Sequence, residues 1–229
     1  MISKSKVAVI GLGNIGTAVG TNLVKGNRAI IVADRKIEKA KELSQKLGNL
    51  ARPMEIPDAI KDADIIVFAV WFNVIKDLLN KYPTELRGKI IVDPSNPIAR
   101  DDKGRFKKII GEQESAGQIL SSLLPKDAKL AKALGTLGVV SLAGAAFQKP
   151  ANVLFYATDD TGINEEVEQL IRDNGFEPLR VGGIDQSIRI EAFGDLHESG
   201  ALGKTVTMSE AMKIHLQFTC HEIEGNSGT

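Results

Sequence analysis

A glycine-rich turn between an apolar run and an amphipathic segment is the part of this 229-residue sequence best suited to hold a ligand. Gly11, Gly13 and Gly16 form the pattern G-x-G-x-x-G directly after the apolar residues 7–10. The first glycine allows a tight turn, the second lets a pyrophosphate approach the backbone, and the third lets a helix pack closely on the strand. The helix start adds unpaired N–H groups and a positive dipole end. The turn is therefore predicted to bind the phosphates of a dinucleotide through Gly11, Leu12, Gly13, Asn14, Ile15 and Gly16.

Two neighbouring residues give opposite indications of which dinucleotide is bound. Asp34 ends the next apolar run and lies 18 residues beyond Gly16, where such folds place the group that contacts the adenosine ribose. A carboxylate there accepts hydrogen bonds from a free 2′-hydroxyl and repels a 2′-phosphate, which favours NAD(H). Arg35 can pair with a 2′-phosphate, which favours NADP(H). From these residues both coenzymes remain open.

Further candidate binding residues follow the later apolar runs. In an open parallel sheet, ligands bind beyond the carboxyl ends of the strands. Trp71 can cover a nicotinamide or another flat ring, or can fill space between strand and helix. Asn96 can hydrogen-bond a carboxamide or substrate, or can serve only as a turn residue. The predicted binding residues in these segments are Val70, Trp71, Phe72, Asn96, Pro97 and Thr136.

Other kinds of catalytic site find little support. No histidine lies near cysteines or carboxylates at metal-ligand spacing, so no metal site is predicted. His197 is expected to be a partly exposed helical histidine rather than a proton donor. The G-x-S-x-G pattern is absent, and neither Tyr82 nor Tyr156 is followed four residues later by lysine. The catalytic residues are thus unknown, which suits hydride transfer between two bound rings, where positioning supplies much of the rate.

Alternating strands and helices are expected to position these residues. Nearly continuous apolar runs are typical of strands covered on both faces of a parallel sheet, and their spacing with helical segments predicts a doubly wound, mainly parallel Rossmann-type α/β fold. Pro178 marks the last strand as an edge. The expected strands are 7–10, 29–33, 64–70, 89–92, 129–134, 153–157 and 176–181, and the expected helices include 36–47, 58–62, 115–124 and 164–174.

Less regular structure is expected elsewhere. Residues 99–111 are polar and are predicted to be an exposed loop, and the glycine-containing residues 135–147 an irregular segment near the ligand. The expected organisation is a nucleotide-binding domain over 1–181, a helical segment over 182–221 and a frayed tail over 222–229. Residues 182–216 are rich in apolar side chains, so they are expected to cover the acceptor side and to form a homodimer interface. The alternative is that they complete the core of a monomer.

The composition of the chain indicates which classes of partner and which cellular location to expect. Lysine plus arginine total 29, and aspartate plus glutamate also total 29, so neither nucleic acid nor an anionic membrane surface is the expected partner. No apolar run is long enough to span a bilayer, and the start of the chain leaves no room for a signal peptide. Cys220 is the only cysteine, so a reducing, cytoplasmic location is predicted.

Several motifs together resemble a known family. VAVIGLGNIG at 7–16, DRKIEKA at 34–40, AVWF at 69–72, DPSNPIARDDKG at 93–104 and ALGT at 133–136 are similar to segments of the deazaflavin (coenzyme F420)-dependent NADP oxidoreductases. The resemblance implies that the glycine turn holds the pyrophosphate, that Asp34 and Arg35 meet the 2′-phosphate, and that residues 70–72 line the nicotinamide. The family commonly has serine or threonine in place of Asp34, and some members have histidine in place of Gly135.

These observations lead to one function and one alternative. The expected function is an NAD(P)H-dependent oxidoreductase that exchanges a hydride with a small ring acceptor such as a deazaflavin or a flavin, with NADP(H) favoured. The alternative is a module that binds NAD(P) and signals through a partner without turnover.

Overall fold

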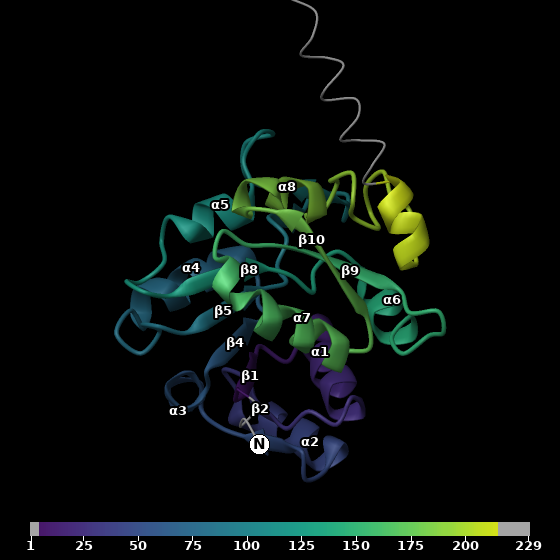
Figure 1. Cartoon of the computed structure of the whole chain (residues 1–229). Helices are drawn as coiled ribbons and strands as arrows, with labels where there is room; N and C mark the ends of the chain where they lie inside the picture. Colours follow the sequence, from purple (N-terminus) through teal and green to yellow (C-terminus); the bar gives the residue numbers. More distant parts are fainter. Residues whose placement is uncertain (1–4, 215–229) are drawn as a thin grey trace, which may run out of the picture.

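The computed structural model describes residues 5–214 of the chain. The predicted tail 222–229 and the end of the predicted 182–221 segment lie outside the described residues. An eight-stranded sheet runs through the molecule in the order β10-β9-β8-β5-β4-β1-β2-β3 (Figure 1). Its strands are β1 (Val7–Ile10), β2 (Ile30–Ala33), β3 (Ala51–Pro53), β4 (Ile65–Phe68), β5 (Ile90–Asp93), β8 (Lys129–Lys132), β9 (Val153–Ala157) and β10 (Glu177–Gly182).

Six of these strands are parallel and confirm the predicted Rossmann-type fold. The last two depart from that pattern: β9 and β10 are parallel to each other, but β9 is antiparallel to β8, to which it pairs through Lys132 and Ala157. Pro178 lies in the edge strand β10, as predicted, and Pro53 lies in β3 at the opposite edge of the sheet. A proline costs least there, since an edge strand has one side without a hydrogen-bonded neighbour.

Helices cover both faces of the sheet, and alternate residues of each strand contact opposite layers. In β1, Val7 and Val9 pack into one core, while Ala8 and Ile10 pack into the other. Figure 1 shows α1, α6 and α7 together on one side and α3, α4 and α5 on the other. The helices are α1 (Asn14–Lys25), α2 (Ile37–Leu47), α3 (Ile56–Asp62), α4 (Phe72–Lys81), α5 (Ala116–Ser121), α6 (Val139–Gly144), α7 (Asn164–Asp173) and α8 (Ser187–Ile190), with short 3₁₀ turns η1 (Thr161–Ile163) and η2 (Ile184–Gln186).

Two segments are more regular than their composition indicates. The predicted exposed loop 99–111 contains an antiparallel hairpin of β6 (Ile98–Arg100) and β7 (Phe106–Lys108), which we call the β6–β7 hairpin. The predicted irregular segment 135–147 contains helix α6. In both, long-range contacts outweigh weak local preference: Ile109 N donates to Pro97 O, and the start of α6 is bound by Glu198, 60 residues away.

The segment after β10 packs on the reversed strands and builds a third core. Ile190, Leu196 and Val206 are buried there against β9 and β10, whereas Phe193 and Met212 are exposed. Its described part contains η2, α8 and helical residues at 208–214, and turns occupy residues 192–201 between them. Much of the apolar surface of this segment is therefore buried within one chain. Exposed apolar surface on the segment no longer gives a reason to expect a homodimer. The homodimer itself stays a prediction.

Candidate cofactor and acceptor site

The glycine turn has the geometry that a dinucleotide requires. Gly11 adopts a φ of +93°, and a Cβ there would lie 2.3 Å from Val70 Cγ1. A Cβ on Gly16 would lie 1.8 Å from Gly11 O, so only glycine lets α1 approach the turn. A Cβ on Gly13, by contrast, would meet nothing within 4 Å. The turn thus leaves room beside Gly13, where a pyrophosphate would need it.

The start of α1 supplies hydrogen-bond donors beside that space. Gly13 is the N-cap residue and offers no side chain, so no side-chain hydrogen bond caps the helix. The first N–H groups of a helix have no partner within it, and a twelve-residue helix presents a positive dipole end there. Asn14 is exposed, and Ile15 packs partly into the core. The unpaired N–H groups and the positive dipole end at the start of α1 are suited to binding a phosphate group.

Asp34 is turned toward the glycine turn and is buried. Its Oδ2 accepts a hydrogen bond from Leu12 N at 2.9 Å, and its Oδ1 accepts one from Lys36 N at 3.2 Å. Arg35 and Lys36 beside it are exposed. The carboxylate therefore fixes the turn with both its oxygens, while the two neighbouring cations face solvent.

The segment after β4 divides between surface and core. Val70 is half-buried and lies against the position where Gly11 would carry a Cβ. Trp71 precedes α4 and has 61% of its surface exposed, so it does not fill space between strand and helix. Phe72 is packed in the core on the α3 and α4 side. Contrary to expectation, its side chain therefore points away from the surface on which a coenzyme would lie.

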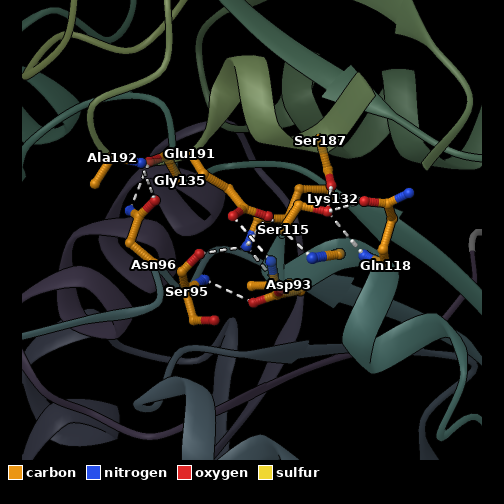
Figure 2. Close-up of polar contacts among 12 residues, drawn as sticks. Asp93, Ser95, Asn96, Ser115, Gln118, Lys132, Gly135, Ser187, Glu191 and Ala192 are labelled. Carbon is orange, nitrogen blue, oxygen red and sulfur yellow. Dashed lines mark hydrogen bonds and ion pairs between the residues drawn. The ribbon is translucent and has the colours of Figure 1, made fainter. Parts of the chain in front are cut away.

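The side chain of Asn96 makes two hydrogen bonds within the protein. Its Oδ1 accepts a hydrogen bond from Ala192 N at 2.6 Å, and its Nδ2 donates to Gly135 O at 3.2 Å. It therefore joins the ends of β5 and β8 to the C-terminal segment (Figure 2). Pro97 next to it is buried. Thr136 is also buried, and its hydroxyl has no hydrogen-bond partner among residues 5–214.

A buried charged cluster, which the sequence did not reveal, lies beneath these loops (Figure 2). Lys132 Nζ donates to Asp93 Oδ2 at 2.7 Å and to Ser95 O, and it lies 3.8 Å from Glu191 Oε1. Glu191 also accepts hydrogen bonds from the N–H groups of Ala116 and Gly117, both at 2.9 Å. Burial raises the pKa of Glu191, and Lys132 opposes that rise.

Asp93, Lys132 and Glu191 come from β5, β8 and the turn after α8. The cluster therefore holds the C-terminal segment against the carboxyl ends of the two strands. The separation of 59 residues between Lys132 and Glu191 explains why spacing in the sequence gave no indication of the pair.

His197 is neither helical nor partly exposed, contrary to expectation. Its Nδ1 accepts a hydrogen bond from Ser199 N at 2.8 Å, which leaves the ring proton on Nε2, 3.1 Å from Gly135 O. Burial lowers the pKa of His197 and keeps the ring neutral. The neighbouring Glu198 accepts from Gly138 N at 2.6 Å and from the Ser141 hydroxyl. Both side chains hold the loop after β8 in place.

Two further observations concern the part of the chain that the structure describes. Between residues 5 and 214, no helix combines the length and the apolar character needed to cross a membrane. Over the same residues, no three histidine, cysteine or acidic side chains gather where they could hold a metal ion.

Comparison with known proteins agrees with this geometry. Residues 6–97, which include the glycine turn and β1 to β5, match the family model described as "NADP oxidoreductase coenzyme F420-dependent". The F420-dependent NADP reductase of Methanocaldococcus jannaschii is 24% identical over 214 residues, which cover 83% of this chain and 90% of the relative.

Solved structures share the fold over most of the chain. A hypothetical protein, SMa0349, from Sinorhizobium meliloti superposes with a TM-score of 0.76 and 25% identity over 89% of this chain and 95% of its own. A candidate F420-dependent NADP reductase from Arthrobacter sp. FB24 gives a TM-score of 0.68 with 22% identity over 80% of this chain and 87% of its own. Residues 6–97 are therefore similar to the family of coenzyme F420-dependent NADP oxidoreductases that the motifs of the sequence indicate.

Proposed function

We propose that this protein transfers a hydride between NADP(H) and a flat ring acceptor of the deazaflavin or flavin type. The observation that carries the proposal is the open space at Gly13 beside the uncapped start of α1, at the carboxyl edge of a parallel sheet. The M. jannaschii relative, an F420-dependent NADP reductase by name, supports this choice of reactants. The nicotinamide would supply the hydride, and the chain's own groups bind and orient the reactants.

The surroundings of Asp34 favour NADP(H) over NAD(H). Each carboxylate oxygen already accepts a backbone hydrogen bond, so the group is less available to a ribose hydroxyl than an isolated carboxylate would be. The exposed side chains of Arg35 and Lys36 are free to meet a 2′-phosphate. A guanidinium matches the geometry of a phosphate, and its hydrogen bonds to charged oxygens are strong.

Replacing Arg35 with alanine is expected to weaken NADPH binding by about 1–3 kcal/mol, the cost of losing a charge-assisted contact. NADH binding should hardly change, because NADH has no 2′-phosphate. Calorimetric titration of both coenzymes measures the difference, with Lys39→Ala, an exposed lysine on α2, as the control. Equal losses for the two coenzymes would instead indicate stacking of Arg35 on the adenine.

A turnover assay tests the proposed reaction against the sensor alternative. NADPH oxidation is followed with a deazaflavin, a flavin and a quinone as acceptors. NADPH oxidation in the presence of a ring acceptor would support the proposed oxidoreductase activity. Tight coenzyme binding without oxidation by any acceptor would support a sensing module.

A further inference from the structure

The loop after β8 has a strained backbone. Leu134 in this loop is buried and adopts a φ of +63°, a region that bulky side chains rarely adopt. The next residue, Gly135, packs against the loop after β5: a Cβ there would lie 2.4 Å from Pro94 O, and Asn96 Nδ2 donates to Gly135 O (Figure 2). Strain of this kind persists only where surrounding contacts determine the conformation, and it is concentrated at functional sites. The loop therefore depends on contacts from outside itself.

Two consecutive residues of the C-terminal segment supply further contacts to this loop. Glu198 N donates to Thr136 O at 3.0 Å, and Glu198 Oε2 accepts from Gly138 N at 2.6 Å. His197 Nε2 lies 3.1 Å from Gly135 O. These contacts join residues about 60 positions apart and fix three backbone groups of the loop. The conformation of the loop is thus linked to the state of the His197 ring.

The His197 ring makes both of its contacts only as one neutral tautomer. Nδ1 accepts a hydrogen bond from Ser199 N at 2.8 Å, so the ring proton lies on Nε2, which faces Gly135 O. A second proton would lie on Nδ1, where it would meet the N–H group of Ser199, and that hydrogen bond would be lost. Only 3% of the residue is exposed, so water has no room to replace the bond. Protonation therefore opposes the position that the ring occupies.

The charges around His197 leave this sensitivity in place. Burial has the largest effect and lowers the pKa of His197, and Lys132 at the end of β8 lowers it too, whereas Glu198 and the contact with Gly135 O raise it. Lys132 is itself paired with Asp93 and lies 3.8 Å from Glu191. Because the folded protein resists a proton that the unfolded chain accepts, the stability that neutral His197 gives is lost as the pH falls below the usual histidine pKa of about 6.5.

The loop that His197 contacts lies at the edge of the sheet where the coenzyme is proposed to bind. β1, β4, β5 and β8 are neighbours in that order and are parallel, so their carboxyl ends lie at one edge. Strands are about 4.8 Å apart, which puts the end of β8 about 14 Å from the glycine turn. A dinucleotide lies across such an edge, with one half on each side of the point where the strand order reverses. Asp34 and Arg35 follow β2 on the adenosine side, so the loop after β8 is on the nicotinamide side.

We propose that neutral His197 is a positioning residue that holds the loop after β8 in the conformation that receives the nicotinamide end of the coenzyme, and that protonation of the ring releases this loop. The ring acts through Gly135 and does not itself contact the coenzyme. This inference rests on the proposed function for the identity of the ligand. It adds a residue that sets coenzyme affinity and the direction in which that affinity changes with pH.

The first test uses two substitutions that separate the contacts of the ring. The amide nitrogen of His197→Gln can replace Nε2 and donate to Gly135 O, whereas the side chain of His197→Asn is too short to reach it. Calorimetric titration with NADP⁺ at pH 7.5 should show affinity reduced about three- to tenfold in His197→Asn and within about twofold of the parent in His197→Gln. The fragment 2′,5′-ADP, which lacks the nicotinamide, should bind all three proteins equally. Unchanged NADP⁺ affinity in His197→Asn, or an equal loss with both ligands, would overturn the proposal.

The second test concerns protonation of the ring. Between pH 7.5 and pH 5.5, the NADP⁺ affinity of the parent should fall about threefold or more beyond that of His197→Gln, because glutamine does not titrate. His215 and His221 are present in both proteins, and both receive the same ligand, so the other titrations cancel in the comparison. The same pH profile in the two proteins would contradict a role for the charge of His197.

Failure of this inference is distinguishable from failure of the proposed function. Hydrogen exchange of residues 133–138 is measured without ligand, and at pH 7.5 it should be faster in His197→Asn than in His197→Gln or the parent. Equal exchange in all three proteins, with NADPH oxidation by a ring acceptor intact, would remove the role of His197 and leave the reaction standing. Exchange as predicted, together with no binding of NADP⁺ by the parent, would keep His197 as the residue that holds the loop and remove the proposed function.

Discussion

Replacement of Lys132 with methionine is expected to lower the free energy of unfolding by about 3–5 kcal/mol, the typical cost of removing one partner from a buried ion pair. The change leaves the carboxylates of Asp93 and Glu191 buried without their shared cation. It also removes the donor to Ser95 O, which helps hold the loop after β5. Urea unfolding of both proteins at pH 7.5 measures the loss.

Lys129→Met is a matched control on the same strand. Lys129 is half-exposed and pairs with Asp160 at 3.0 Å, and such a surface pair contributes about 0–1 kcal/mol. Equal losses in the two variants would contradict the energetic importance of the buried cluster.

The pH dependence of the Lys132→Met variant provides a second check. Burial already raises the pKa of Glu191 and Lys132 opposes that rise, so loss of the cation raises the folded-state pKa of Glu191 further above its unfolded value. A carboxyl group with a raised pKa favours folding at low pH, and that advantage disappears as the pH rises through the folded-state pKa. The destabilisation should therefore be smaller at pH 5 than at pH 7.5. Independence from pH over this range would show that no buried carboxylate is affected.

Replacement of Gly13 with valine is expected to reduce NADPH affinity by about 100-fold or more, about 2.7 kcal/mol, with the fold intact. The valine side chain would occupy the space that the pyrophosphate needs. A Cβ at this position meets nothing within 4 Å, and the φ of −77° suits any residue, so stability should change by less than about 1 kcal/mol. Calorimetry and urea unfolding measure the two effects separately.

Gly16→Val tests the other function of the glycines. A Cβ there would lie 1.8 Å from Gly11 O, so this variant should lose stability and not binding alone. Undiminished NADPH binding by a folded Gly13→Val variant would show that the glycine turn does not bind the coenzyme.

The parallel part of the sheet was predictable because its signals are local. Uninterrupted apolar runs indicate strands buried on both faces, and prolines mark the edges. These signals located the strands that pair with β1, as well as β10 with its Pro178. The orientation of β9 and β10 was not predictable, because strand direction depends on the path of the connecting segment and not on composition.

The candidate site was predictable only where its chemistry lies within one short segment. The glycine turn specifies its own geometry through Gly11 and Gly16. The burial of His197 and the contacts of Asn96 could not be predicted, because their partners Gly135 and Ala192 are far away in sequence. The same holds for Glu191, whose role depends on a fold that brings the C-terminal segment over β8.

The most direct test of the account follows one hydride. NADPH that carries deuterium at the transferable C4 position is mixed with the protein and a deazaflavin in a single-turnover experiment, and the products are analysed by mass spectrometry. The account predicts that NADPH is oxidised and that the deuterium appears in the reduced deazaflavin, with both reactions abolished in Gly13→Val. Tight binding of NADPH that stays unoxidised in the presence of both deazaflavin and flavin would contradict it.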